Sequence, residues 1–198
     1  MRPRTVVLAL HYQNEIVHPE GRIRLGIAAA APERDAIIAA ARRLLDGARA
    51  QGVPVISVRI AFRPDYADIV ANARIWRRVI ADQALAEGSW GAEFYRGLGP
   101  APGELVVTHQ RNNPFHRSAL AEALTRHGAE RLVIAGISTT YVVESAVRHA
   151  SDEGYDVVVA ADACSSATPA MHEASLAAMA QLATVATVDA ILAELAPG

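Results

Sequence analysis

Lysine is absent from this chain, since all 19 of its basic residues are arginine. A Schiff base on lysine, a lysine general acid and a lysine contact to phosphate are therefore excluded. Arginine keeps its proton near neutral pH, so proton transfer there has to use histidine, a carboxylate, tyrosine or water.

Cysteine and excess charge are also scarce. The single cysteine, Cys164, cannot form an internal disulfide. A net charge of −2 without a basic run argues against nucleic acid and membrane surfaces as partners. No stretch approaches the ~20 apolar residues of a membrane span, and the first residues lack the features of a signal peptide. We therefore expect a cytoplasmic protein whose partner is a small molecule.

The 198 residues, 52% of them hydrophobic, are enough for one well-buried domain, which we expect to span residues 1–198. Apolar runs of strand length alternate with segments of helical spacing. The strands are expected at 5–10, 53–60, 104–108, 131–135, 156–161 and 184–187. The helices are expected from Pro32 to a stop at Gly52, and over 117–127, 140–153, 169–182 and 188–195. Residues 61–103 are expected to be irregular and to supply pocket walls or subunit contacts.

This alternation predicts an α/β fold: a doubly wound, mostly parallel sheet of about six strands with helices on both faces. Ligands bind such sheets beyond the carboxyl ends of the strands. Four loops, beginning at His11, Ala61, His109 and Gly136, should meet at that edge.

The stretch from Arg131 to Ser145 reads as a short apolar strand, a turn at Gly136 and the start of a helix. A strand that passes through glycine directly into a helix leaves backbone N–H groups free at the sheet edge, where they can hold an anion or a developing oxyanion. We expect the active site here.

Five sequence segments together resemble the isochorismatase-like (cysteine hydrolase) superfamily over nearly the whole chain. In order, they are VVLALHYQNEIVHPEG, VPVISVRIAFRP, EGSWGAEF, PGELVVTHQRNNPF and LVIAGISTTYVVESAVRHASDEGYDVVVAADAC. The resemblance implies the doubly wound fold, homodimers or homotetramers, and hydrolysis of small amides or of the enol ether of isochorismate. It also implies a cis peptide between Ile137 and Ser138.

Three positions depart from the pattern of that superfamily. Members with a cysteine nucleophile place aspartate, lysine and cysteine where this chain has His11, His109 and Val142. Valine cannot attack a carbonyl, so a thioester mechanism at this position is excluded. Cys164 lies in a later segment, and we expect it to be a small buried residue beside the sheet.

His11 and His109 are the main catalytic candidates, with Glu15 as a third. Two histidines facing one pocket can act as acid and base with pKa values pushed apart, or can bind an anion when one is protonated. The alternative is that each is a hydrogen-bonded structural residue. A metal is not expected, because a third ligand at motif spacing is missing, although Glu15, His18 or His116 could approach. No cofactor is expected.

Further residues are candidates for binding the substrate, each with a structural alternative. Gln13 could contact substrate or only bond within its loop, Arg111 could clamp a carboxylate or form a surface salt bridge, and Tyr141 could donate a hydrogen bond or simply pack. Phe62 and Trp76 fit a pocket wall or a subunit interface. The remaining candidates are Asn113, Phe115, Ser138, Thr139 and Val142.

Three classes of function fit these observations. The first is a hydrolase without a cysteine nucleophile, in which His11 or Glu15 protonates the substrate, or His11 and His109 activate water. The phenazine-pathway isochorismatases also lack the cysteine, but they keep the aspartate and lysine. The second is a binding pseudoenzyme, and the third is a lyase, isomerase or cyclase on the same fold.

Overall fold

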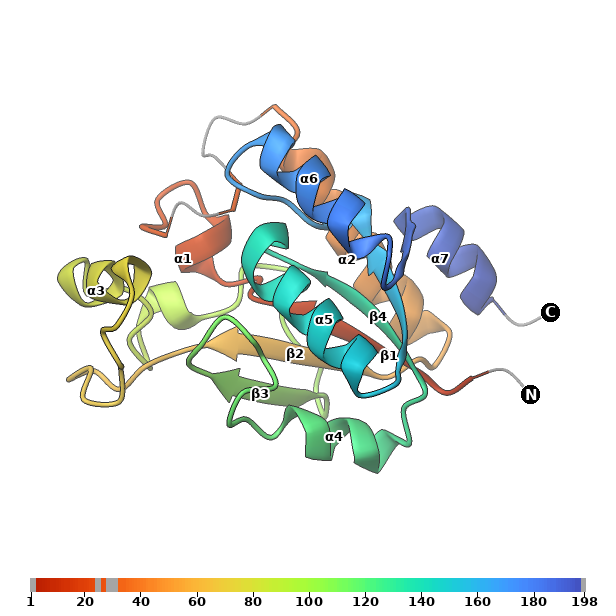
Figure 1. Cartoon of the computed structure of the whole chain (residues 1–198), viewed down its shortest axis with the longest axis horizontal. Coiled ribbons are helices and arrows are strands. Elements are labelled where there is room, and N and C mark those ends of the chain that lie inside the picture. The colour runs from red at the N-terminus through yellow and green to blue at the C-terminus, as the bar shows by residue number, and fades with distance from the viewer. Residues whose placement is uncertain (1–2, 24–25, 28–31, 197–198) are drawn as a thin grey trace.

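A six-stranded, fully parallel sheet forms the centre of the protein in the computed structural model, which describes residues 3–23, 26–27 and 32–196 (Figure 1). The strand order is β3-β2-β1-β4-β5-β6. The strands are β1 (Thr5–Leu10), β2 (Val55–Ile60), β3 (Leu105–His109), β4 (Arg131–Gly136), β5 (Asp156–Ala160) and β6 (Thr184–Ala186). The predicted doubly wound α/β architecture is confirmed.

Helices cover both faces of the sheet. On one face α2 (Arg34–Ala50) packs on β1 and β2 and against α7 (Val188–Leu195). On the other, α5 (Glu144–Asp152) packs on β4 and β5 and against α6 (Pro169–Met179). α4 (Leu120–His127) ends at Gly128, which adopts the left-handed conformation with φ 57° that favours glycine. None of the helices in the described ranges is long and apolar enough to cross a membrane.

The central strands are apolar because both of their sides are buried. Every residue of β1 after Thr5 is buried, as are those of β4 after Arg131. Side chains of α2 reach this core at helical spacing, with Ile38, Leu44 and Leu45 buried. β3 is an edge strand and leaves Leu105 and Val106 exposed.

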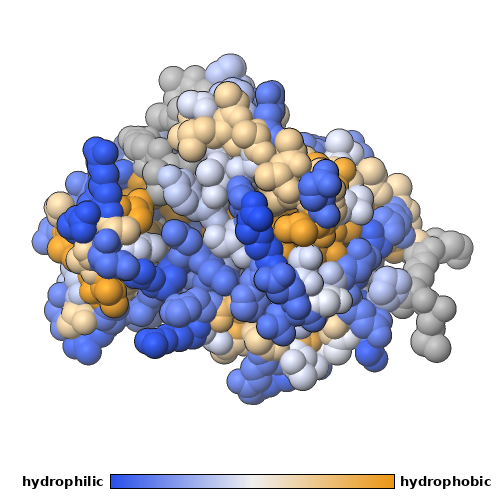
Figure 2. Space-filling model, in the orientation of Figure 1, coloured by the Kyte–Doolittle hydropathy of each residue, from blue (hydrophilic) through white to orange (hydrophobic). Residues whose placement is uncertain are grey.

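Two short helices lie at the carboxyl edge of the sheet, beyond the ends toward which β2 and β3 point in Figure 1. They are α1 (Asn14–Val17) and α3 (Arg74–Ala81). α3 corrects the expectation that residues 61–103 are irregular throughout. Its buried side chains, Trp76 and Val79, are three residues apart as a helix face requires. In Figure 2 hydrophobic residues show at this end of a largely hydrophilic face.

The helices that follow β3 and β4 begin differently from expectation. Arg117 has a positive φ of 50°, so the helix expected from Arg117 begins at Leu120. The helix expected from Thr140 begins as a π-helical turn over Thr139–Val143 and continues as α5. π-turns of this kind are frequent at functional sites.

Gly136 permits the close pairing of β1 and β4. It lies opposite Leu10 in the sheet, and a Cβ at this position would be 2.4 Å from the Leu10 carbonyl oxygen. Since that atom belongs to the backbone of a central strand, it cannot move without disturbing the sheet.

Replacing Gly136 with alanine should therefore lower the free energy of unfolding by about 1–3 kcal/mol, the usual cost of overpacking a core. Gly47→Ala is the control, because the atoms nearest to its Cβ belong to the flexible side chain of Leu192 and not to backbone. Urea denaturation of both variants measures the difference. Equal midpoints for the two variants would contradict this account of Gly136.

Candidate functional site

A largely apolar pocket opens at the carboxyl edge of the sheet. Its empty volume is about 460 Å³, open solvent at the mouth included. It is lined by His11, Ile16, Ile23, Ile60, Ile75, Trp76, Val79, Leu85, Arg111, Asn112, Ile137, Ser138, Tyr141 and Val142.

His11 and His109 contact each other directly at this edge. His11 follows β1 and His109 ends β3, and their Nε2 atoms are 2.5 Å apart. The two rings are nearly parallel, with centroids 4.8 Å apart. A contact this short between ring nitrogens requires a shared proton, so one Nε2 donates and the other accepts.

The backbone of His11 is strained. Its φ is 57°, in the left-handed region that non-glycine residues seldom adopt. Its N–H donates to the Val58 carbonyl oxygen at 2.9 Å, which holds this conformation in place. Strain of this kind costs free energy and is concentrated at functional sites.

Burial disfavours the charged form of both rings. Desolvation, together with repulsion from His109, holds the pKa of His11 well below its usual value. Desolvation lowers the pKa of His109 to about 4, although the backbone of Asn113 opposes the shift. Both histidines are therefore neutral at pH 7.

The two histidines face different spaces. His11 lines the apolar pocket, whereas His109 lines a polar groove with Gln110, His116 and Arg117. Arg111 lines both spaces. The pair thus connects the pocket to a surface from which protons can be exchanged with water.

The turn after β4 forms another wall of the pocket. The peptide between Ile137 and Ser138 is cis, as the sequence resemblance implied. The Ser138 carbonyl oxygen accepts hydrogen bonds from the N–H groups of Tyr141 and Val143, both at 3.3 Å. Ser138 Oγ is buried and has no hydrogen-bond partner among the described residues, so it is available to a ligand.

Thr139 supports this turn from behind. Its side chain is fully buried, and its Oγ1 lies 2.8 Å from Nδ1 of His172. Its N–H donates to the Ser165 carbonyl oxygen at 2.8 Å. Thr139 is not among the residues that line the pocket, so it positions the turn.

Gln13 is fully buried and holds two segments together. Its amide nitrogen donates to the carbonyl oxygens of Ile60 and Ala92, and its amide oxygen accepts from the Ile60 N–H. These three bonds occupy the amide group, in line with the loop-bonding alternative.

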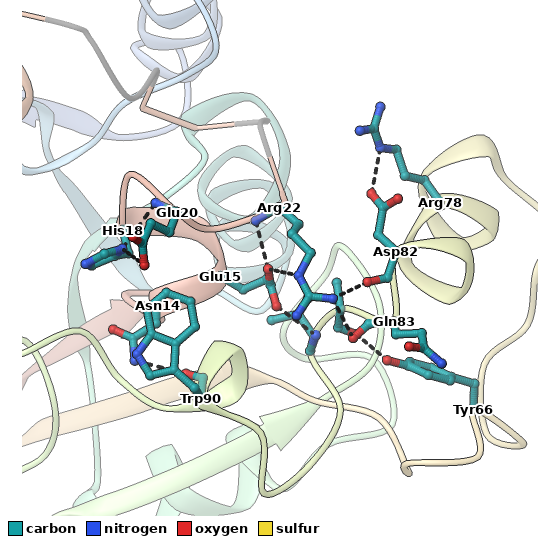
Figure 3. A network of polar contacts seen from close by, with 12 residues as sticks. Asn14, Glu15, His18, Glu20, Arg22, Tyr66, Arg78, Asp82, Gln83 and Trp90 are labelled. Carbon is teal, nitrogen blue, oxygen red and sulfur yellow. Dashed lines mark hydrogen bonds and ion pairs between the residues drawn. The ribbon is translucent and has the colours of Figure 1, made fainter.

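Glu15 lies in α1, and its carboxylate forms a hydrogen bond and an ion pair with Arg22 (Figure 3). Its Oε1 accepts from the Arg22 N–H at 2.8 Å and lies 3.4 Å from the guanidinium Nε. A Cβ on Gly91 would meet Oε2 at 2.0 Å, so the carboxylate is tightly enclosed. Glu15 does not line the pocket.

The aromatic candidates divide between the pocket and its support. Trp76 lines the pocket, and Phe62 packs behind it at 6.0 Å between ring centroids. Arg111 stacks on Trp76, with its guanidinium carbon 5.0 Å from the ring centroid. Phe115 stacks instead on His149 at 4.4 Å, and the amide of Asn113 bonds to the same histidine.

Cys164 is buried beside the sheet. Its sulfur accepts a hydrogen bond from the Gly136 N–H at 3.4 Å, and burial raises the pKa of its thiol to about 12. It is not among the residues that line the pocket. A thiolate nucleophile is thus not available to this site near neutral pH.

Much of the apolar wall was not anticipated from the sequence. Ile16 and Ile23 come from a segment that reads as a polar loop, and Ile75, Val79 and Leu85 from a stretch that was expected to be irregular. The spacing of Ile75 and Val79, four residues apart, was a helical signal. Within the described residues no group of three or more histidines, cysteines or carboxylates could hold a metal ion.

Comparison with known proteins agrees with this geometry. The family model for the isochorismatase domain matches residues 5–190. The chain is 30% identical over 189 residues to ureidoacrylate amidohydrolase RutB of Methylobacterium radiotolerans, covering 87% of this chain and 72% of that protein. An isochorismatase family protein from Desulfovibrio vulgaris matches with a TM-score of 0.86 at 27% identity, over 99% of this chain and all of that one.

A further solved structure, N-carbamoylsarcosine amidase from Thermoplasma acidophilum, has a TM-score of 0.73 at 23% identity. The match covers 94% of this chain and 97% of that one, and it is a likeness of fold alone. The family model, in contrast, spans nearly the whole chain and includes both histidines and the turn after β4. The chain therefore belongs to the isochorismatase family of hydrolases.

Proposed function

We propose that this protein hydrolyses a small amide, or a related carboxylate or enol ether, without a cysteine nucleophile. The observation that carries the proposal is the 2.5 Å contact between the Nε2 atoms of His11 and His109 at the edge of a largely apolar pocket. A neutral, hydrogen-bonded imidazole pair can accept a proton from water and return it to a leaving group.

The histidine pair suits activation of water. Because Nε2 of His11 is occupied by His109, its Nδ1 is the nitrogen left for the substrate side. Nδ1 would take a proton from water as the water oxygen bonds to the substrate carbonyl carbon. In the same step Nε2–H would pass its proton to His109, so the positive charge is carried by the ring that lines the polar groove.

The reverse transfers complete the reaction. As the carbon–nitrogen bond of an amide breaks, Nδ1 of His11 would return a proton to the leaving nitrogen and His109 would restore the proton on Nε2. The net change is the addition of one water molecule, which gives a carboxylic acid and an amine. The proposal does not depend on Glu15, whose carboxylate is held by Arg22.

The turn after β4 would stabilise the negative charge that develops on the substrate oxygen. Ser138 lines the pocket together with Tyr141 and Val142, and its buried hydroxyl has no partner among the described residues. Hydrogen-bond donors fixed in advance around a developing oxyanion lower the barrier without reorganisation. The relative named as an amidohydrolase favours an amide over the other two bond types.

The proposed small-molecule substrate is the only partner this mechanism needs. The exposed Leu105 and Val106 of edge strand β3 are consistent with coverage by a second copy of the chain. Assembly as a homodimer or homotetramer and a cytoplasmic location stay predictions.

Replacing His11 or His109 with glutamine should lower turnover at least about 100-fold, the usual contribution of general acid–base catalysis. His127→Gln is the matched control, because His127 lies in the last turn of α4 and does not line the pocket. The variants are assayed with small amides, carboxylates and enol ethers in ¹⁸O-labelled water. The assay measures the rate of turnover and shows whether the product contains ¹⁸O.

Each of the other outcomes identifies an alternative. Unchanged turnover in both histidine variants would contradict the proposed roles. Product without the label would indicate a lyase, isomerase or cyclase. Saturable binding with no turnover in the unaltered protein would indicate a pseudoenzyme.

The depressed pKa values predict that acid weakens the fold. The unfolded chain takes up protons on these two histidines below about pH 6.5. In the folded chain the pKa of His109 is lowered to about 4, and burial together with repulsion from His109 holds the pKa of His11 well below its usual value. Their contribution to stability is therefore complete above pH 6.5 and is lost as the pH falls toward 4. For His109 alone the loss is on the order of 3 kcal/mol.

Urea denaturation at several pH values measures this loss. The double variant His11→Gln/His109→Gln should show a much smaller decline between pH 7 and pH 5 than the unaltered protein, and His127→Gln should show the full decline. If all three declined equally, the histidines would not be buried in neutral form.

A further inference from the structure

We infer that the substrate of this pocket is a small carboxylate with a hydrocarbon body, branched or aromatic, whose carboxylate is held by Arg111. The inference rests on the proposed function of the same pocket and names the class of molecule on which it acts. Two independent features carry it: the composition of the pocket wall and the position of Arg111.

The pocket wall offers few partners to a polar substrate. Nine of its fourteen residues are apolar, and all of these except Ile75 are buried. They come from α1, α3, the strand ends and the intervening loops, so they surround the space on several sides. A ureido group would bring two nitrogen donors and a carbonyl oxygen into this space, and a buried polar group without a partner costs binding free energy.

Besides Arg111, the polar residues of the wall are His11, Ser138, Asn112 and Tyr141, and the proposed chemistry uses the first two of these. His11 and Ser138 lie beside each other in the pocket lining where β1 and β4 end. They suit the bond that reacts, and they leave the apolar part of the lining, which includes Trp76 and Val79, to the rest of the substrate. Hydrocarbon is the group that this wall binds best.

Arg111 is the one permanent charge in the pocket lining. Its guanidinium stacks on Trp76 and donates to the Val70 carbonyl oxygen at 3.2 Å and to Asn72 Oδ1 at 3.0 Å. Among the described residues its nitrogens form no ion pair with a carboxylate. The cation is thus held in a fixed position by neutral groups and keeps N–H donors for an anion.

Three molecules with the same skeleton of eight non-hydrogen atoms test the inference. 4-Methylpentanoate has the hydrocarbon body and the carboxylate, N-carbamoylglycine replaces the branched end with a ureido group, and 4-methylpentanamide removes the charge. Trp76 reports binding by fluorescence in the Trp90→Phe background. Trp90 is 45% exposed and does not line the pocket.

We expect 4-methylpentanoate to bind at least about tenfold more tightly than N-carbamoylglycine. Arg111→Gln should weaken the binding of 4-methylpentanoate at least about tenfold and the binding of 4-methylpentanamide less than about twofold. Arg77→Gln is the matched control, since Arg77 is exposed on α3, bonds to the Ala71 carbonyl oxygen and is outside the pocket lining. It should change neither affinity.

Several results would overturn the inference: N-carbamoylglycine binding as tightly as 4-methylpentanoate, Arg111→Gln without effect, or no saturable signal from 4-methylpentanoate up to about 10 mM. The proposed function fails separately. If the ligands bind with the expected affinities but no amide is hydrolysed, the inferred class of ligand stands and the proposed hydrolysis is wrong. If ureido compounds are hydrolysed in a reaction that depends on His11, the proposed hydrolysis stands and the inferred class of ligand is wrong.

Discussion

The contact between two buried histidines is the interaction on which the site depends. Desolvation keeps both rings neutral, and their shared proton orients each ring against the other. To make the contact, His11 adopts a left-handed backbone at the end of β1, and His109 reaches it past the end of β2. A neutral pair of this kind can move protons without introducing a lasting charge into an apolar pocket.

The rest of the carboxyl edge is built around that pair. Gly136 lets β4 approach β1 closely, which brings the turn with Ser138 beside His11. Thr139 and Gln13 are tied to backbone and side-chain partners and hold the surrounding loops in place. The sole cysteine is buried and the pKa of its thiol is raised, so the proposed proton transfer uses imidazole and not a thiolate.

The strands of the sheet could be predicted from the sequence because a strand buried on both sides is a continuous apolar run. The bounds of β1 and α7 were predicted to the residue, since each is a continuous apolar or amphipathic run with clear ends. The meeting of His11 and His109 at one edge also followed from parallel topology. Both statements depend only on the order of elements and on which residues end the strands.

The composition of the pocket wall could not be predicted in the same way. Ile16 and Ile23 become part of it only because the segment after β1 folds back over the edge, where the Glu15–Arg22 ion pair joins its two ends. α3 was missed because arginines interrupt its apolar spacing, although Trp76 and Val79 mark its buried face. Such contacts between loops depend on tertiary packing, for which short sequence windows carry little information.

Nitrogen NMR of ¹⁵N-histidine-labelled protein tests the central claim most directly, with His11→Gln and His109→Gln used to assign the two rings. At pH 7 both rings should be neutral, each in one fixed tautomer, with a single proton between their Nε2 atoms. Neither ring should titrate near the usual histidine pKa of about 6.5. Titration of both rings near pH 6.5, with tautomers averaging as in water, would contradict the account.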